Sequence, residues 1–194
     1  MKRSLPLILA LLAFLSGAAQ TPASPPPFTT AINAVLSDFA DNLRHITGEL
    51  LLAQGEFENY ASRVELPGSR NCMITRYHSA YDTTASWQAK MATRDDFNAA
   101  AREYHDLYLK LETCTLQLAD GTILYLKGKW EPAREGLAFT TSNLRLTTGY
   151  GPYRHLNVEL ELVYELDAWS VNINIFSKER EGEPVITGTI PGTH

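Results

Sequence analysis

Residues 156–175 constrain the fold of this chain more than any other segment, because their side chains alternate between apolar and polar. The apolar positions are Leu156, Val158, Leu160, Leu162 and Tyr164, then, after a turn near Asp167, Trp169, Val171, Ile173 and Ile175. An alternation of period two predicts β-strands with one face on a core and the other in water. The segment therefore predicts a long antiparallel hairpin.

Two other segments have helical spacing. The first has apolar residues at steps of three and four and follows a capping residue, Thr29 or Thr30; its stripe is Ile32, Val35, Leu36, Phe39, Leu43, Ile46 and Leu50. The second begins near Asp95, where Thr93 and Asp96 resemble a capping box; its apolar face is Phe97, Ala100, Ala101, Tyr104, Leu107, Tyr108 and Leu111. This spacing predicts two amphipathic helices.

The rest of the pattern predicts further strands over 60–66, 72–77, 85–91, 115–118, 122–130 and 137–146, and a short edge strand over 185–190. The order is helix, about three strands, helix, about five strands. It predicts an α+β fold in which two amphipathic helices pack on a mostly antiparallel, meander-like sheet. Each half also has a tryptophan near the start of a strand, Trp87 and Trp169. An α-βββ duplication with lobes 28–92 and 93–178 is therefore an open alternative to a single domain over 28–178.

The first nineteen residues have the pattern of a secretory signal peptide. Lys2 and Arg3 precede an apolar run over 5–15, and small side chains follow it. The run is shorter than the roughly 20 residues that span a bilayer. We expect cleavage after Ala19, with Ala18 a close alternative. No cysteine follows the run to accept a lipid, so we expect a soluble periplasmic or extracellular protein and not a lipoprotein.

The segments around the domain are polar or rich in proline. Residues 20–27 contain four prolines and predict an extended leader, and residues 179–194 predict a flexible tail. No segment after the leader has the length of a membrane span. The net charge of −5 becomes −7 once Lys2 and Arg3 are removed, because 15 basic residues then face 22 acidic ones. An acidic chain disfavours nucleic acid as a partner.

Cys72 and Cys114 are the two cysteines of the chain. In an oxidising compartment the simplest expectation is one disulfide, which would close a loop of roughly 40 residues and stabilise the fold by about 3–4 kcal/mol. Two unrelated buried thiols are the alternative. Neither cysteine has the paired CxxC or HxxxH spacing of a metal site, and we expect no metal and no cofactor.

The sequence contains no HExxH, GxSxG, GxxxxGK(S/T) or GxGxxG motif and no EF-hand loop. The strongest histidine is His78, which Asp82 would orient if the two formed an acid/base site in a cleft. Glu159 and Glu161 share the polar face of one strand. We interpret them as solvated charge that pairs across the sheet with Lys127, Lys129 or Arg145, in preference to a catalytic carboxylate pair.

Tyr150 and Tyr153 flank Gly151 and Pro152 in a predicted loop. Exposed tyrosines contribute large contact area at low entropic cost, so these two are candidate binding residues. The alternative is that they fold back onto the edge of the sheet.

Two functions fit this pattern. The first is an exported, non-enzymatic protein that binds a protein or envelope partner, as inhibitors and immunity proteins do. The second follows from the element order, which resembles that of NTF2-like and cystatin-like folds and implies a pocket for a small ligand, with or without catalysis. A filled core with a concave aromatic patch favours the first function, and an enclosed pocket above about 300 Å³ favours the second.

Overall fold

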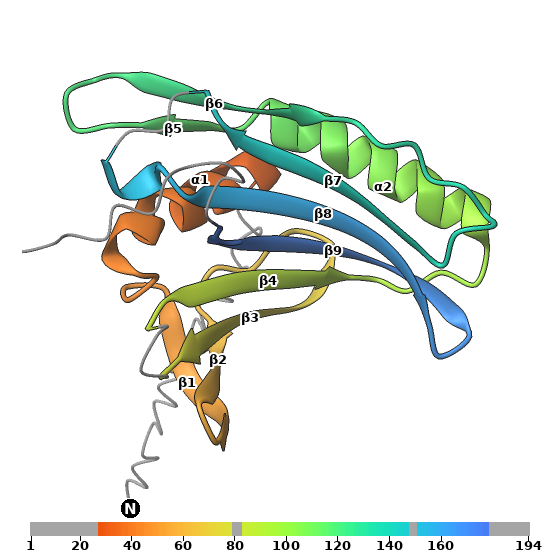
Figure 1. The fold of residues 1–194 in the computed structure, drawn as a ribbon, viewed down its shortest axis with the longest axis horizontal. Coiled ribbons are helices and arrows are strands. Elements are labelled where there is room, and N and C mark those ends of the chain that lie inside the picture. The colour runs from red at the N-terminus through yellow and green to blue at the C-terminus, as the bar shows by residue number, and fades with distance from the viewer. Residues whose placement is uncertain (1–26, 79–82, 148–150, 179–194) are drawn as a thin grey trace, which may run out of the picture.

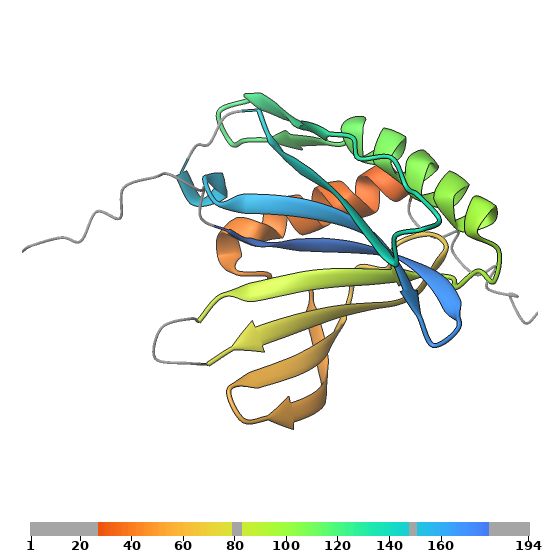
Figure 2. The same ribbon diagram turned by 45° about the vertical axis from the view of Figure 1, so that its right-hand side comes forward.

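A nine-stranded antiparallel sheet with two helices on one of its faces organises the chain (Figures 1 and 2). The computed structural model describes residues 27–78, 83–147 and 151–178. The helices are α1 (Phe28–Asp38) and α2 (Phe97–Glu112), with the short 3-10 turns η1 (Phe39–Asp41) and η2 (Gly151–Tyr153). The strands are β1 (Thr47–Gln54), β2 (Phe57–Ser62), β3 (Ser69–Tyr77), β4 (Ala85–Met91), β5 (Thr115–Gln117), β6 (Ile123–Lys129), β7 (Phe139–Leu146), β8 (Leu156–Glu165) and β9 (Ala168–Ser177). The expected α+β class is confirmed.

The strand order is β1-β2-β3-β4-β9-β8-β7-β6-β5, so each helix is followed by its own meander. The last strands of the two meanders, β4 and β9, pair with each other at the centre, from Trp87 opposite Ile175 to Lys90 opposite Asn172. The two halves therefore share one sheet. Each half begins with a helix, as the α-βββ alternative expects, but four strands follow α1 and five follow α2 instead of three. Common descent of the halves stays a prediction.

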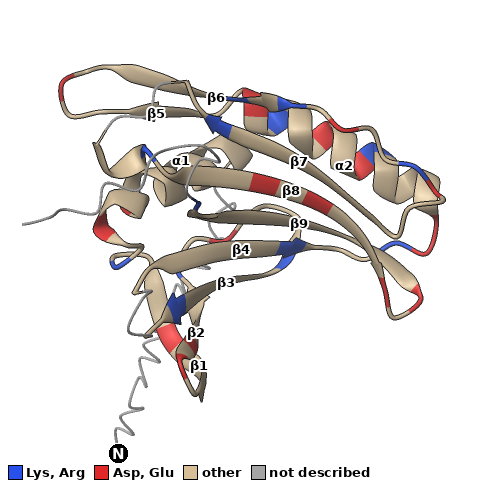
Figure 3. Ribbon diagram, in the orientation of Figure 1, with Lys and Arg blue, Asp and Glu red and all other residues tan. Residues whose placement is uncertain are grey.

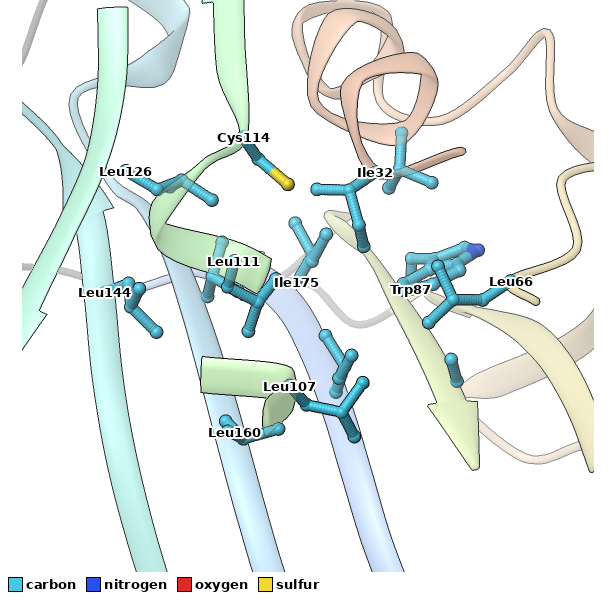
Figure 4. Packing of buried hydrophobic residues seen from close by; sticks show 14 of the residues in the cluster. Ile32, Leu66, Trp87, Leu107, Leu111, Cys114, Leu126, Leu144, Leu160 and Ile175 are labelled. Carbon is cyan, nitrogen blue, oxygen red and sulfur yellow. The ribbon is translucent and has the colours of Figure 1, made fainter. Parts of the chain in front are cut away.

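One hydrophobic core lies between the helices and the sheet (Figure 4). Its largest fully buried side chains include Trp87 of β4 and Tyr104 of α2. The Tyr104 hydroxyl is hydrogen-bonded to Ser142 Oγ of β7 at 2.7 Å, which satisfies a polar group that burial would otherwise leave unpaired. Alternate residues of β4, β8 and β9 face this core, and the residues between them form the opposite, polar face of the sheet.

The strongest strand predictions are confirmed. The hairpin of β8 and β9 pairs from Leu156 opposite Ser177 to Glu165 opposite Ala168. The predicted strand over 85–91 is β4, and the strands predicted over 115–118 and 122–130 are found as β5 and β6, which pair antiparallel. The predicted edge strand over 185–190 lies outside the described residues.

The first helix is shorter than its apolar stripe predicts. The α-helix ends at Asp38, and residues 47–54 form β1 instead of two further helical turns. The break is local: Asn42 and Leu43 both have positive φ, and the Asp38 carboxylate accepts hydrogen bonds from the backbone N–H groups of His45 and Ile46. Leu43 and Ile46 are buried in the core after this turn, and for this reason the apolar spacing of the sequence continues beyond the end of the helix.

The ends of the helices also differ from the expectation. Thr29 and Thr30 lie inside α1, and the residue before the helix is Pro27, which offers no capping side chain. At α2 the N-cap is Asp96, whose carboxylate accepts from the Ala99 N–H at 2.7 Å, so Thr93 and Asp96 form no capping box. Among the described residues, no helix has both the length and the apolarity needed to cross a membrane.

Candidate functional site

Three chain segments meet at the end of the sheet where β8 turns into β9. The backbones of Arg94 and Trp169 exchange two hydrogen bonds of 2.7 and 2.8 Å, and the Tyr164 N–H donates to the Ala138 carbonyl at 2.8 Å. These contacts border a cavity of about 490 Å³. We call it the tip pocket; its walls are Asp95, Asp96, Phe97, Glu135, Gly136, Ala138, Tyr164 and Trp169.

Three aromatic rings form the floor of the tip pocket. Phe97 meets Trp169 edge to face, with ring centroids 5.1 Å apart, and Tyr164 contacts Trp169 at 5.0 Å. Trp169 is 7% exposed, whereas Tyr164 is 44% exposed. Trp169 is thus held by the fold, and Tyr164 presents a ring to solvent that the protein itself leaves uncovered.

The turn beside the pocket contains a leucine, Leu166, in a backbone conformation that is unfavourable for leucine. Leu166 and Asp167 are the two residues between β8 and β9, with φ of +50° and +62°. Positive φ at both positions is the type I′ geometry, in which Asn and Gly are preferred. Leu166 is 99% exposed, so no packing compensates for its backbone conformation. Leu166 therefore combines a strained backbone with an exposed apolar side chain, which makes it a candidate contact for another molecule.

Replacing Leu166 with asparagine is expected to raise the free energy of unfolding by about 0.5–1 kcal/mol, because asparagine tolerates the left-handed conformation that leucine resists. Chemical denaturation measures the change. The matched control is Leu109→Asn on the exposed side of α2, where asparagine lowers helix propensity and stability should fall. A loss of stability in Leu166→Asn would show that the leucine is held by contacts within the chain.

The rim of the tip pocket is acidic. Asp95, Asp96 and Glu135 line it, and Glu165 and Asp167 lie in the adjoining turn. Figure 3 shows this concentration at the β8–β9 turn and before α2. Within the described ranges the only ion pair of these five carboxylates is the 3.9 Å approach of Glu165 to Lys90. The rim therefore favours a positively charged group.

Asp82 lies outside the described residues, so the predicted pairing of His78 with Asp82 stays a prediction. His78 Nε2 lies 2.8 Å from Glu58 Oε2 of β2, and the Tyr60 hydroxyl donates to the same oxygen at 2.6 Å. The hydrogen bonds from Tyr60 and His78 lower the pKa of Glu58. His78 is half exposed, so its contact with Glu58 joins the end of β3 to β2 at the surface.

The expected disulfide is not formed: Cys72 and Cys114 are free thiols. Cys72 lies on β3, near the Leu66 N–H and Ser69 Oγ, and Cys114 lies between α2 and β5 in the core (Figure 4). Five strands separate β3 from β5 in the sheet, whereas a disulfide needs Cα atoms within about 7 Å. Burial raises the pKa of Cys114 to about 12, which keeps that thiol protonated and unreactive.

Of the two candidate binding tyrosines, Tyr150 lies outside the described residues. Tyr153 packs against the core, and its hydroxyl donates to the Ser37 carbonyl at 3.4 Å. Tyr153 therefore folds back onto the protein, but onto α1 and not onto the edge of the sheet.

Glu159 and Glu161 also differ from the expectation. Lys127, Lys129 and Arg145 share their face of the sheet, but Lys127 pairs with Glu112 and Lys129 with Glu131. Among the described residues no ion pair reaches either glutamate. Both are half-buried on β8 and line a second cavity, of about 460 Å³, on the polar face.

One cluster has the composition of a metal site. Asp38, Asp41 and His45 place their ligand atoms within 4.8 Å of one another. The buried Asp38 carboxylate already accepts two backbone N–H groups and the His45 ring nitrogen. These hydrogen bonds hold the turn between η1 and β1, which gives the cluster a structural role.

Sequence reasoning missed the tip pocket because it assigned Tyr164 and Trp169 together to the core. The available signal was the turn: Leu166 and Asp167 replace the Asn-Gly pair that a two-residue hairpin turn favours. Comparison of the chain with family models, with curated proteins and with solved structures gives no match. The geometry of the sites therefore carries the functional assignment.

Proposed function

We propose that this chain is an exported, non-enzymatic binding protein that takes a basic segment of a protein partner into the tip pocket. The observation that carries the proposal is the half-exposed ring of Tyr164 on a fixed Trp169, beside a fully exposed Leu166. Rigid aromatic anchors beside apolar contacts are typical of protein-binding surfaces.

Charge favours a basic segment. A lysine or arginine of the partner would pack its aliphatic stem on Tyr164 and Trp169 and place its cation among the carboxylates of Asp95, Asp96 and Glu135. Two attractive effects then coincide, because an aromatic face and a carboxylate both bind cations. The surrounding charge also increases the rate of encounter with a basic partner at low salt.

The ligand-pocket alternative places its ligand between the helices and the sheet, as in cone-shaped folds. Large buried side chains occupy that region, among them Trp87 of β4 and Leu160 of β8 (Figure 4). Tyr104 of α2 is also fully buried in the core. A filled core with a concave aromatic patch at one end favours partner binding over a ligand inside the core.

The test is affinity capture from the envelope fraction of the source organism with three forms of the mature protein: wild type, Tyr164→Ala and Tyr125→Ala. Tyr125 is the matched control, since it is 48% exposed and lies on β6, away from the tip pocket. We expect a partner that wild type and Tyr125→Ala retain equally. Tyr164→Ala should recover at least tenfold less of it, as for a hot spot of about 2 kcal/mol.

Added salt should reduce the recovery, because the proposed contact joins opposite charges. The proposal is wrong if the three baits retain the same proteins in equal amounts, or if no protein depends on Tyr164. Equal melting temperatures of the variants ensure that a loss of recovery reflects the missing ring.

A further inference from the structure

The polar face of the central sheet holds a second cavity, separate from the tip pocket. Its walls come from β3, β4, β9 and β8, the four neighbouring strands at the front of Figure 1. Tyr77 and Phe176 line one part of it, and Gln88, Asn174, Glu159 and Glu161 line another. We call this cavity the polar groove. Its volume of about 460 Å³ is that of a small-molecule site.

The strand register places each glutamate between neutral polar residues. Glu159 lies opposite Asn174 of β9 on one side and Asn143 of β7 on the other. Glu161 lies opposite Asn172 and Thr141 in the same way. No cationic side chain occupies a cross-strand position beside either carboxylate.

The amide donors of the polar groove are already used within the protein. Asn174 Nδ2 donates to Glu161 Oε2 at 2.9 Å, and Asn172 Nδ2 donates to the same oxygen at 3.3 Å. Gln88 Nε2 donates to Asn174 Oδ1 at 2.8 Å. Carboxylates only accept, so these contacts also fix which end of the Asn172 and Asn174 amides faces Glu161.

Two buried amide oxygens on this face of the sheet accept no hydrogen bond within the described residues. Asn172 is 8% exposed and its side chain is directed at Glu161, yet within the described residues its Oδ1 has no hydrogen-bond partner. Asn157 Oδ1 is also buried and, within the described residues, unpaired; Asn157 lies opposite Phe176, two residue pairs along the same face from Asn172. A buried acceptor without a donor costs about 1–3 kcal/mol. The polar face beside the groove thus has more acceptors than donors, and the lining carboxylates of Glu159 and Glu161 favour a molecule that brings donors.

The charge of the polar groove also favours a positively charged ligand that donates hydrogen bonds. Burial raises the pKa of Glu159, and the nearby charge of Glu161 raises it further. A hydrogen bond from the Asn174 side chain and, more weakly, the charge of Lys178 just beyond β9 lower the pKa of Glu159 and partly oppose this effect. Lys90 lies opposite Asn172, and its Nζ lies 3.9 Å from Glu165; Arg145 of β7 lies opposite Lys127 of β6. Two half-buried carboxylates thus repel each other without a cation between them.

We propose that the polar groove binds a small aliphatic amine, with its primary ammonium groups donating to the carboxylates of Glu159 and Glu161, which both line the groove. An ammonium group has three donors and no acceptor, which matches the donor deficit of the site. Its positive charge relieves the repulsion between the carboxylates, and the hydrocarbon chain can lie along Tyr77 and Phe176.

The experiment is calorimetric titration of the mature protein with spermidine at low salt and pH 7.5. We expect saturable binding in wild type and at least a tenfold loss of affinity in Glu159→Gln/Glu161→Gln. The matched control is Glu49→Gln/Glu56→Gln, which removes the same charge from the exposed β1–β2 hairpin and should bind as wild type does. Equal loss in both variants would mean that only the net charge matters and would overturn the proposal.

Two further titrations distinguish an amine from two other kinds of ligand that could bind the same oxygens. Calcium chloride tests a metal ion held by the same oxygens, and trehalose tests a neutral polyol. Saturable binding of either one, with none of spermidine, would overturn the amine assignment. The Tyr164→Ala variant should bind spermidine as wild type does, so a failed tip pocket and a failed polar groove give different results.

Binding should also depend on pH with a defined sign. The ammonium ligand needs ionised carboxylates, and the raised pKa of Glu159 means that this group takes up its proton at a higher pH than an ordinary glutamate. Affinity for spermidine should therefore fall as pH falls, beginning above the usual glutamate range. Affinity that stays constant from pH 7.5 to 4 would overturn the role of Glu159.

Discussion

Replacing Trp87 with alanine is expected to lower the free energy of unfolding by about 3–5 kcal/mol, the cost of removing a large aromatic side chain from a packed core. Trp87 is fully buried on β4, directly beside β9 where the two meanders join. The cavity would therefore open at the centre of the sheet. Urea denaturation followed by circular dichroism measures the change.

Trp87→Phe is the control for the hydrogen bond of the indole. Trp87 Nε1 donates to Ser62 Oγ of β2 at 3.0 Å, and phenylalanine removes this bond while it fills most of the space. We expect a loss nearer 1 kcal/mol for Trp87→Phe. A loss below about 1.5 kcal/mol in Trp87→Ala would contradict the position of Trp87 in the core.

Replacing Asp38 with alanine is expected to cost about 2–4 kcal/mol. The Asp38 carboxylate is 8% exposed and accepts from the backbone N–H groups of His45 and Ile46 and from the His45 ring nitrogen, at 2.5–3.1 Å. Alanine would leave two backbone donors without their acceptor, one of them in a buried contact, and each such donor costs about 1–3 kcal/mol. Denaturant unfolding measures the loss.

Asp41 provides the matched control for Asp38. It is exposed and approaches the His45 ring only to 3.9 Å, so Asp41→Ala should change stability by less than about 0.5 kcal/mol. Similar effects of the two substitutions would show that general charge at the turn, and not the two backbone hydrogen bonds, stabilises it. Such a result would also mean that the Asp38 carboxylate does not determine where α1 ends.

The sheet could be predicted from the sequence because a period of two is a local property. The alternation over 156–175 shows which face of β8 and β9 meets the core, and the structure has that face buried. The end of α1 could not be predicted in this way. The apolar spacing of residues 32–50 fits one continuous helix, and it fits equally well a shorter helix followed by a turn that brings the chain back to the core. Asp38 decides between them through contacts made seven and eight residues later.

The sites were harder to predict than the strands, because they depend on neighbours that are distant in the sequence. Trp169 meets Phe97 across more than seventy residues, and Ala138 completes the same cavity. Glu159 and Glu161 have the pattern of solvated charge until the order of the strands puts Asn172 and Asn174 beside them. The disulfide expectation failed for the same reason, since the spacing of two cysteines contains no information on the strands that lie between them.

Hydrogen–deuterium exchange of the protein with its captured partner tests the location of the binding site most directly. We predict that the partner slows exchange at residues 94–97, 135–138 and 164–169, which surround the tip pocket, and leaves the exposed β5–β6 hairpin unchanged. Protection confined to β5 and β6, or to the polar face of the central strands, would contradict the assignment of partner binding to the tip pocket.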